Sequence, residues 1–341
     1  MGARFDAHPL FAFGGRTSLA DKEQLDHVPG VRLFTVIGLL VLNGWGWQQP
    51  LPVSRFPLPG TRYPSPENKV SYVSNPTVPT DIIVVAHQDD WQLFMGDVVA
   101  GRIRSGARTV FIYLTAGDDG RDSLYWTTRE HGALESTRIA AAGLTIDTAV
   151  TCSTAKALEH AIRKCTIANT ESYFFRLPDG RRDGRGFARH SYQSLRKLRA
   201  KRMTSMSAVD GSAAYNSWAD LVATVTALIG EGSMDRTVTI FTSDPSVVVN
   251  PHDHFDHRMS GLLVADSRRK NNWNVAYYTG YALASRAANR SKDQTRQKVA
   301  LFQAYDGVMT RANPKWSAYR EHPAFYAECM LRTYGRKIPW R

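Results

Sequence analysis

The sequence predicts an α/β fold, a Rossmann-like three-layer sandwich with a mostly parallel sheet and an active site at the carboxyl edge of that sheet. Two observations lead to this fold class. β-rich segments alternate with helical segments from Thr80 onward, and such alternation favours parallel strands joined by helices. Chemically active side chains also follow two of the strand segments, where open parallel sheets place their functional groups.

The individual strands and helices are predicted from hydrophobic pattern and residue type. The run TDIIVVA at 80–86 is rich in β-branched residues and predicts a buried strand. Strands are expected at Thr80–Ala86, Arg108–Leu114, Tyr173–Leu177, Thr237–Thr242 and Trp273–Tyr278. Helices are expected at Trp91–Ser105, Thr127–Ala142, Trp218–Ile229, His254–Arg268 and Asp293–Tyr305. One catalytic domain, residues 79–341, accounts for all of them.

The residues before this domain divide into a leader, 1–49, and a linker, 50–78, which is rich in proline. The apolar run Leu33–Leu42 is too short to span a bilayer and has the length of a signal-peptide core. It predicts an exported protein, periplasmic or secreted, cleaved after about residue 43 or anchored to the membrane. Either the true start lies near Val28 or the leader is an unusual one. As an alternative, the run is a buried element of the fold, and the protein is then cytoplasmic.

Composition excludes several classes of protein. With 43% hydrophobic and 22% charged residues, the chain is neither disordered nor collagen-like nor a polytopic membrane protein. Three cysteines, Cys152, Cys165 and Cys329, allow at most one disulfide. Most of the net charge of +12 comes from the segment Arg181–Arg202, which contains nine Lys and Arg residues and one acidic residue. This segment is either a solvated face or a surface for a glycan or phosphate.

Two clusters of histidine and aspartate follow separate strands. Their members are His87, Asp89, Asp90, His254, Asp256 and His257. An imidazole and carboxylates this close together are unfavourable unless a cation holds them. Histidine and carboxylate ligands suit zinc with one position open to water. For either cluster alone, surface histidines at a helix start capped by Asp253 are the alternative explanation.

The segments AHQDD (86–90) and HFDH (254–257) resemble the AHPDDE and HPDH motifs of the PIG-L/LmbE-like zinc de-N-acetylases. The resemblance extends over about Thr80 to Tyr305. It includes Thr115-Ala116-Gly117 with Gly120, Arg129-Glu130, and Lys298 with Tyr305. It implies a zinc-dependent hydrolase that cleaves an amide C–N bond and removes the N-acetyl group of an amino sugar, such as N-acetylglucosamine, or of a glycoconjugate.

The resemblance also implies a role for each residue of the site. The expected zinc ligands are His87, Asp90 and His257. Asp89 would be the general base that takes a proton from the zinc-bound water. His254, oriented by Asp256, would stabilise the oxyanion or protonate the leaving amine. Arg129 and Arg121 would bind the substrate. Trp91 and Gln88 replace the family's usual Glu and Pro, and Gly132 stands where an acid is usual after Arg129.

Other residues near the strand ends allow two interpretations. Asp118 and Asp119 either shape a glycine-rich turn, which we favour, or face the cleft. Arg121 and Arg129 bind sugar hydroxyls or phosphate, or they pair with those aspartates. Three aromatic side chains either belong to the core or form a stacking platform for a pyranose ring: Trp91, Tyr125 and Trp126.

The sequence is also compatible with two functions other than N-deacetylation. The chain has no GxSxG, P-loop or GxGxxG motif, which argues against serine hydrolase, NTPase and dinucleotide-binding functions. The second function class is a non-catalytic module that binds an anionic glycan or nucleic acid through Arg181–Arg202, with a steep salt dependence and no need for zinc. A third keeps the zinc but removes an N-acyl group longer than acetyl. For the enzyme, we expect no nucleic-acid partner and a membrane contact only through an N-terminal anchor.

Overall fold

The computed structural model describes residues 79–142, 148–233, 237–269, 271 and 273–338. All of them belong to the second of the two units into which the chain divides, Tyr72–Arg341. The predicted leader, 1–49, and linker, 50–78, lie outside the described residues, so both assignments stay predictions. Within the described ranges, no helix is both long enough and apolar enough to cross a bilayer.

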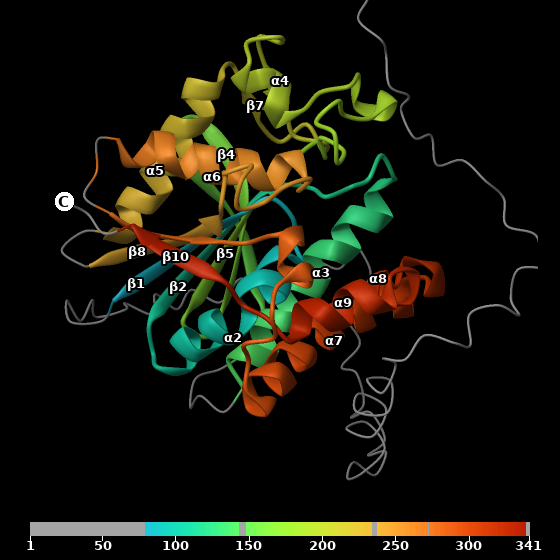
Figure 1. Ribbon diagram of the computed structural model, residues 1–341. Helices are drawn as coiled ribbons and strands as arrows, with labels where there is room; N and C mark the ends of the chain where they lie inside the picture. Colours follow the sequence, from blue (N-terminus) through green and yellow to red (C-terminus); the bar gives the residue numbers. More distant parts are fainter. Residues whose placement is uncertain (1–78, 143–147, 234–236, 270, 272, 339–341) are drawn as a thin grey trace, which may run out of the picture. The chain divides into compact units, whose positions relative to one another are not determined.

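An eight-stranded sheet forms the centre of the described unit (Figure 1), in the order β10-β9-β8-β1-β2-β5-β4-β3. Strands β1, β2, β5, β8 and β9 run parallel, whereas β3, β4 and β10 pair antiparallel toward the two edges. The strands are β1 Thr80–Val85, β2 Arg108–Thr115, β3 Thr151–Ala157, β4 His160–Ile167, β5 Thr170–Leu177, β8 Val238–Ser243, β9 Asn274–Tyr278 and β10 Gly335–Ile338. A separate short pair consists of β6 Met206–Ser207 and β7 Ala214–Tyr215.

Helices cover both faces of the sheet and complete the three layers (Figure 1). In β1, Ile83 and Val85 enter one hydrophobic core and Ile82 and Val84 enter the other, as the alternation of side chains along a strand requires. The helices of the first core are α2 Asp90–Arg104, α3 Ser123–Ala140, α7 Lys292–Ala312 and α9 Pro323–Met330. Those of the second are α4 Leu195–Arg199, α5 Trp218–Ser233 and α6 Phe255–Arg268. The short elements are η1 Ala188–His190, η2 Tyr281–Ser285, η3 Pro314–Trp316 and α8 Ala318–Glu321.

The fold class predicted from the sequence is confirmed, and each expected strand and helix is present. The bounds differ by up to four residues, except that α7 continues to Ala312, seven residues beyond the expected end at Tyr305. The antiparallel edge strands were not predicted. β3 has the sequence TCSTAKA and is exposed over most of its length, and β10 is mostly exposed as well. Neither strand shows the alternation of apolar and polar residues that predicts a strand from sequence. Both are strands because they pair with a neighbouring strand and not because they bury apolar side chains in the core.

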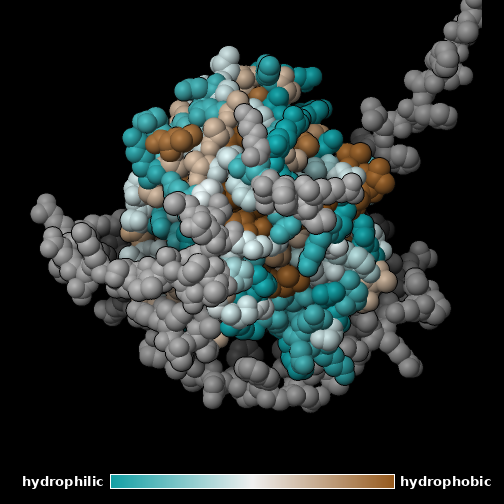
Figure 2. Space-filling view, turned by 90° about the vertical axis from the view of Figure 1, so that its left-hand side faces the viewer, coloured by the Kyte–Doolittle hydropathy of each residue, from teal (hydrophilic) through white to brown (hydrophobic). Residues whose placement is uncertain are grey.

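The β3–β4 hairpin carries the one disulfide that the cysteine count allows. Cys152 and Cys165 face each other across the hairpin and are bonded, whereas Cys329 is buried and free. On the coloured part of the face shown in Figure 2, hydrophobic areas are small and separated by polar residues. Exposed apolar side chains scattered in this way are ordinary for a folded protein.

Candidate active site

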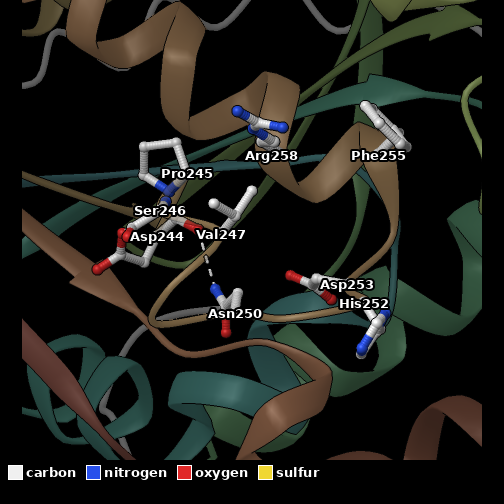
Figure 3. Close-up of a pocket in the computed structure, with 9 residues that line it drawn as sticks. All are labelled: Asp244, Pro245, Ser246, Val247, Asn250, His252, Asp253, Phe255 and Arg258. Carbon is white, nitrogen blue, oxygen red and sulfur yellow. Dashed lines mark hydrogen bonds between the residues drawn. The ribbon is translucent and has the colours of Figure 1, made fainter. Parts of the chain in front are cut away.

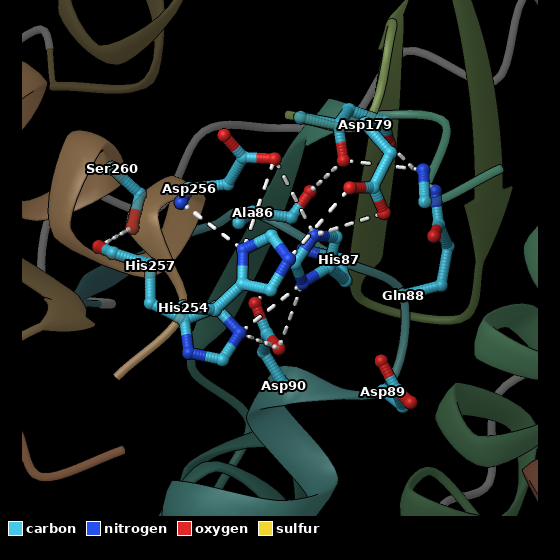
Figure 4. Close-up of polar contacts among 12 residues, drawn as sticks. Ala86, His87, Gln88, Asp89, Asp90, Asp179, His254, Asp256, His257 and Ser260 are labelled. Carbon is cyan, nitrogen blue, oxygen red and sulfur yellow. Dashed lines mark hydrogen bonds and ion pairs between the residues drawn. The ribbon is translucent and has the colours of Figure 1, made fainter. Parts of the chain in front are cut away.

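The candidate site lies at the centre of the sheet, where β1 and β8 end. The chain leaves β1 toward β2, and β8 is the neighbour of β1 on the other side. Strand ends that diverge in this way form the crevice in which open α/β sheets bind ligands. His87 and Asp90 follow β1 directly, and His257 lies in the first turn of α6, after β8. The side chains converge (Figure 4).

Three donor atoms in this crevice have the spacing of a metal site. His87 Nδ1 lies 3.1 Å from His257 Nε2, and Asp90 Oδ1 lies 3.0 Å from His257 Nε2 and 3.5 Å from His87 Nδ1. Two ligands of a tetrahedral zinc, each about 2.0–2.1 Å from the ion, are about 3.3 Å apart. The residues present therefore fit a zinc ion. We call these three residues the donor cluster.

Two further groups of buried ligand atoms overlap the donor cluster. The ligand atoms of His87, His254 and His257 lie within 4.8 Å of one another, as do those of His87, Asp179, His254 and Asp256. The donor cluster is tighter than this limit, with separations of 3.0–3.5 Å. The close spacing favours the ligand set expected from the sequence.

The electrostatics of the donor cluster also favour a bound cation. Burial disfavours a protonated His87, but the charges of Asp90 and Asp179 and a hydrogen bond with Asp256 outweigh burial and raise its pKa to about 10. Burial likewise opposes the charges of Asp90 and Asp253 at His257, and the pKa of His257 still rises well above its usual value. Positive charge between these side chains, as protons or as a metal ion, is therefore strongly favoured.

His254 caps the start of α6 and lies beside the donor cluster. Its Nδ1 accepts a hydrogen bond from the backbone N–H of Asp256 at 3.1 Å, which leaves the ring proton on Nε2. The His254 and His87 rings meet edge to face, with centroids 4.6 Å apart. Burial first, and then the cationic His87 and His257, lower the pKa of His254 well below its usual value. A neutral ring with Nε2–H available as a donor is the result.

Asp256 is fully buried between the ends of β5 and β8. Its Oδ2 accepts from the backbone N–H of Gly180 at 2.7 Å and lies 3.7 Å from His87 Nε2. A Cβ atom at position 180 would lie 2.4 Å from Asp256 Oδ1, so only glycine allows this close approach. Asp256 therefore connects the loop after β5 to the HFDH segment.

Asp179 is a site residue that the sequence reasoning missed. Its Oδ2 lies 3.6 Å from His87 Nε2 and its Oδ1 lies 3.7 Å from His254 Nε2 (Figure 4). Burial raises its pKa to about 6, against the opposing charge of His87. The segment Pro178-Asp179-Gly180 directly follows the parallel strand β5, and no site residue was predicted there. The rule that polar residues after such a strand face the crevice would have identified it.

Asp253 was missed as well. Its Oδ1 lies 3.0 Å from His257 Nδ1 and also accepts from the backbone N–H of Tyr281 at 3.2 Å. A carboxylate on the second ring nitrogen fixes the tautomer that presents Nε2 to the donor cluster. The sequence analysis considered Asp253 only as a helix cap, a role that His254 performs.

Asp89 lies to the side of the donor cluster (Figure 4). It pairs with Arg129. Arg129 Nη2 donates to Asp89 Oδ1 at 2.5 Å, and Nη1 donates to the carbonyl of Gly117 at 2.8 Å. Both side chains are mostly buried, 14% exposed for Asp89 and 10% for Arg129. Of the two interpretations of Arg129, pairing with a carboxylate is the one observed, but the partner is Asp89 and not Asp118 or Asp119.

The other uncertain residues near the strand ends occupy ordinary structural positions. Asp118 accepts from the backbone N–H of Gly120 at 2.9 Å and so shapes the turn, and it also contacts His190 at 2.8 Å. Arg121 pairs with Asp119 at 3.1 Å, and its guanidinium lies over the ring of Tyr125 at 4.4 Å. Trp91 and Trp126 are buried in the protein, and Tyr125 is half-buried.

A small cavity lies on the outer side of Asp253 (Figure 3). It has a volume of about 230 Å³, and its lining includes Val247, Asp253, Phe255 and Arg258. Pockets for small-molecule ligands usually measure about 300–1,000 Å³. This cavity is therefore small for a sugar substrate.

The basic segment Arg181–Arg202 packs against the HFDH loop. The backbone N–H of Phe255 donates to the carbonyl of Arg182 at 3.2 Å, and Arg182 Nη2 donates to the carbonyl of His252 at 3.1 Å. The guanidinium of Arg196 lies 4.3 Å from the ring centroid of Phe255. The segment thus supports the loop that carries His254, while other cations of the segment, such as Arg189, stay exposed.

Comparison with solved structures finds similar folds at low identity. N,N'-diacetylchitobiose deacetylase from Pyrococcus horikoshii is 16% identical, with 79% of this chain and 88% of that chain covered and a TM-score of 0.37. The zinc-inhibited form of teicoplanin deacetylase Orf2 is 12% identical (76% and 96% covered, TM-score 0.41). GalB, a 4-carboxy-2-hydroxymuconate hydratase from Pseudomonas putida, is also 12% identical (73% and 83% covered, TM-score 0.37). No curated protein matches the chain.

Family membership is decided by the sequence profile. The family described as PIG-L, GlcNAc-PI de-N-acetylase, matches residues 82–267, more than half of the 341 residues. The match includes the end of β1, the end of β8 and every residue of the donor cluster. This chain belongs to the PIG-L family of de-N-acetylases, a family of amide hydrolases.

Proposed function

We propose that this protein is a zinc-dependent hydrolase that removes an N-acetyl, or another N-acyl, group from an amino sugar or glycoconjugate. One observation carries the proposal: the donor cluster brings His87, Asp90 and His257 from two strand ends to within 3.0–3.5 Å of one another. This spacing and this set of donors suit a catalytic zinc site with three protein ligands and one open position.

His87 Nδ1, Asp90 Oδ1 and His257 Nε2 are the atoms that would hold the ion. Zinc in such a site supplies Lewis acidity, which activates a water molecule and polarises the amide carbonyl. The protein contributes the orientation of the ligands. Asp253 fixes the ring of His257, and the backbone N–H of His87 donates to Asp90 Oδ2 at 2.8 Å.

Asp89 is the proposed general base. It is a mostly buried carboxylate that directly precedes the ligand Asp90 in the sequence, and Arg129 holds its Oδ1 atom. The second carboxylate oxygen, Oδ2, would accept the proton of the attacking water. Arg129 thereby orients the base. Arg129 and Arg121 are also the proposed substrate-binding residues.

His254 is the proposed proton donor at the reacting amide. Its Nδ1 is occupied by the N–H of Asp256, so Nε2 carries the proton that can stabilise the oxyanion or pass to the leaving amine. Asp256, buried at the base of α6, holds His254 in this orientation through its backbone and lies beside the ring.

The proposal is tested by metal content combined with amine release. Purified protein is analysed for zinc and then incubated with a panel of N-acetylated and longer N-acylated amino sugars. We expect about one zinc per chain and release of the free amine from at least one sugar. A protein that binds no zinc and binds an anionic glycan with a steep salt dependence would instead support the non-catalytic binding module.

We also propose that the protein is exported. The apolar run Leu33–Leu42 supports this proposal, and so does the disulfide between Cys152 and Cys165, because disulfides persist mainly in oxidising compartments. Mature protein from the native host that begins after about residue 43 would agree with export. Full-length protein recovered with both cysteines reduced would contradict it.

A further inference from the structure

Five aromatic side chains form a continuous arc beside the candidate active site. They are Tyr281 of η2, Phe302 and Tyr305 of α7, and Phe325 and Tyr326 of α9, and we call them the aromatic arc. All five lie beyond residues 82–267, so the match to the family assigns no role to them.

The aromatic arc runs from the donor cluster to the Asp89–Arg129 pair. The Tyr281 ring meets His257 at 5.0 Å and Phe325 at 5.4 Å between centroids. The series continues from Phe325 to Tyr326 at 5.3 Å, Tyr326 to Phe302 at 4.9 Å and Phe302 to Tyr305 at 6.3 Å. It ends where Arg129 lies 6.0 Å from the ring of Tyr305. The aromatic arc therefore extends from the ligand His257 to Arg129, the partner of the proposed general base Asp89.

Three phenol hydroxyls of this wall have no partner within the protein. In the part of the chain that the structure describes, the hydroxyls of Tyr281, Tyr305 and Tyr326 make no hydrogen bond to protein, and Tyr305 is the most buried of the three, at 2% exposed. Tyr281 and Tyr326 are half-buried, so part of each side chain is open. By contrast, the phenols of Tyr173 and Tyr334 donate to Glu171 and to the carbonyl of Ala287.

The same three hydroxyls lie within electrostatic reach of Asp89. Burial raises the pKa of Tyr281, Tyr305 and Tyr326, and the negative charge of Asp89 raises each of them further. Tyrosines of three separate elements thus face one carboxylate. Together with the ring contacts, this places the aromatic arc beside the Asp89–Arg129 pair.

The chemistry of this wall suits a sugar ring. Aromatic faces pack against the apolar C–H face of a pyranose, and free phenol hydroxyls donate to and accept from sugar hydroxyls. A long acyl chain would gain nothing from the hydroxyls and would leave them without partners. We propose that the aromatic arc is the subsite for the sugar ring of the substrate, with Tyr281 and Tyr326 as specificity-determining residues. This proposal rests on the proposed N-deacetylase function.

The test compares two substrates with the zinc-loaded, full-length protein. N-acetylglucosamine presents a ring with hydroxyls, and N-cyclohexylacetamide presents a ring of similar size without them. We expect Tyr281→Phe and Tyr326→Phe each to raise KM for N-acetylglucosamine about three- to tenfold, the scale of one lost hydrogen bond. For N-cyclohexylacetamide, KM should stay within about twofold, and kcat should do so for both substrates.

Tyr319→Phe is the matched control, because Tyr319 lies on α8, close to the aromatic arc in sequence, and is 41% exposed. The Tyr319→Phe variant should leave KM and kcat unchanged for both substrates. Calorimetric titration of the same proteins with glucosamine gives a second readout, and its Kd should rise by a similar factor in the two arc variants. Unchanged KM and Kd, or an equal rise for both substrates, would overturn the subsite. If the wild type cleaves neither substrate, the deacetylase function fails, and the titration with glucosamine still decides the subsite.

Discussion

The donor cluster and the aromatic arc meet at the contact between His257 and Tyr281 and are built on opposite physical principles. The donor cluster gathers ionisable groups out of water, 3.0–3.5 Å apart, and fixes each by polar contacts to strand ends. The aromatic arc is held by ring packing at 4.9–6.3 Å between centroids and leaves three hydroxyls without protein partners.

This difference indicates which residues carry out the reaction and which residues select the substrate. Removing one member of the donor cluster leaves buried charges without compensation, so its loss should be all-or-none. Removing one hydroxyl from the aromatic arc leaves the packing intact, so its loss should be graded and should depend on the substrate. The reaction is therefore expected to depend on the donor cluster, and the choice of substrate on the aromatic arc.

The largest effect should come from removing a member of the donor cluster. We expect His87→Ala, Asp90→Ala and His257→Ala each to lower zinc content sharply and to abolish amine release, because two protein ligands are too few to hold the ion. His252→Asn is the control, since His252 is exposed in the same loop and asparagine tolerates its φ of 57°. Full zinc content in all three variants would refute the ligand set.

The next effect separates catalysts from ligands. His254→Ala and Asp89→Asn should keep zinc and lower kcat by about 100-fold or more, the usual scale for losing an acid, base or oxyanion donor. In Asp89→Asn the side-chain oxygen can still accept from Arg129, so folding should be preserved. If His254→Ala strips the metal, the two histidines of HFDH have exchanged roles. If both variants keep full activity, the deacetylase proposal is wrong.

Much of the fold and the donor cluster could be predicted from the sequence because their signals are local. The run at 80–86 is a buried strand through its own composition, and His87, Asp89 and Asp90 follow it directly. HFDH likewise holds its residues within a single turn. The exposed strands β3 and β10 have no such local signal, since pairing alone defines them.

The remainder of the site depends on contacts between segments far apart in the sequence. Asp179 comes to the site from the end of β5, and Tyr326 comes from α9, well over 200 residues after His87. Arg129 was predicted to bind sugar or to pair with a nearby aspartate, but its partner Asp89 lies 40 residues before it. No spacing rule predicts the contacts of Arg129 and Tyr326, because they depend on how α3, α7 and α9 pack.

An intermediate effect is expected at Asp253, which connects the two regions. Its Oδ1 contacts His257 of the donor cluster and the backbone N–H of Tyr281 in the aromatic arc. Asp253→Asn should weaken zinc binding by about 10- to 100-fold, the usual effect of losing a carboxylate behind a histidine ligand. Competition with a chelator measures this affinity, with the exposed Asp293→Asn as control. Equal affinities in the two variants would mean that Asp253 does not orient His257.

The smallest effect on catalysis is expected from the disulfide, and it tests whether the aromatic arc acts on substrate or only on stability. Cys152 and Cys165 join β3 to β4, at the edge of the sheet, with 13 residues of separation. Replacing both by serine should lower the free energy of unfolding by up to about 3 kcal/mol, measured by urea denaturation. KM and kcat should stay within about twofold, because β1 and β8, which carry the donor cluster, lie in the other half of the sheet. If this variant raises KM for N-acetylglucosamine as much as Tyr326→Phe does, general destabilisation explains both increases. The aromatic arc would then not determine substrate specificity.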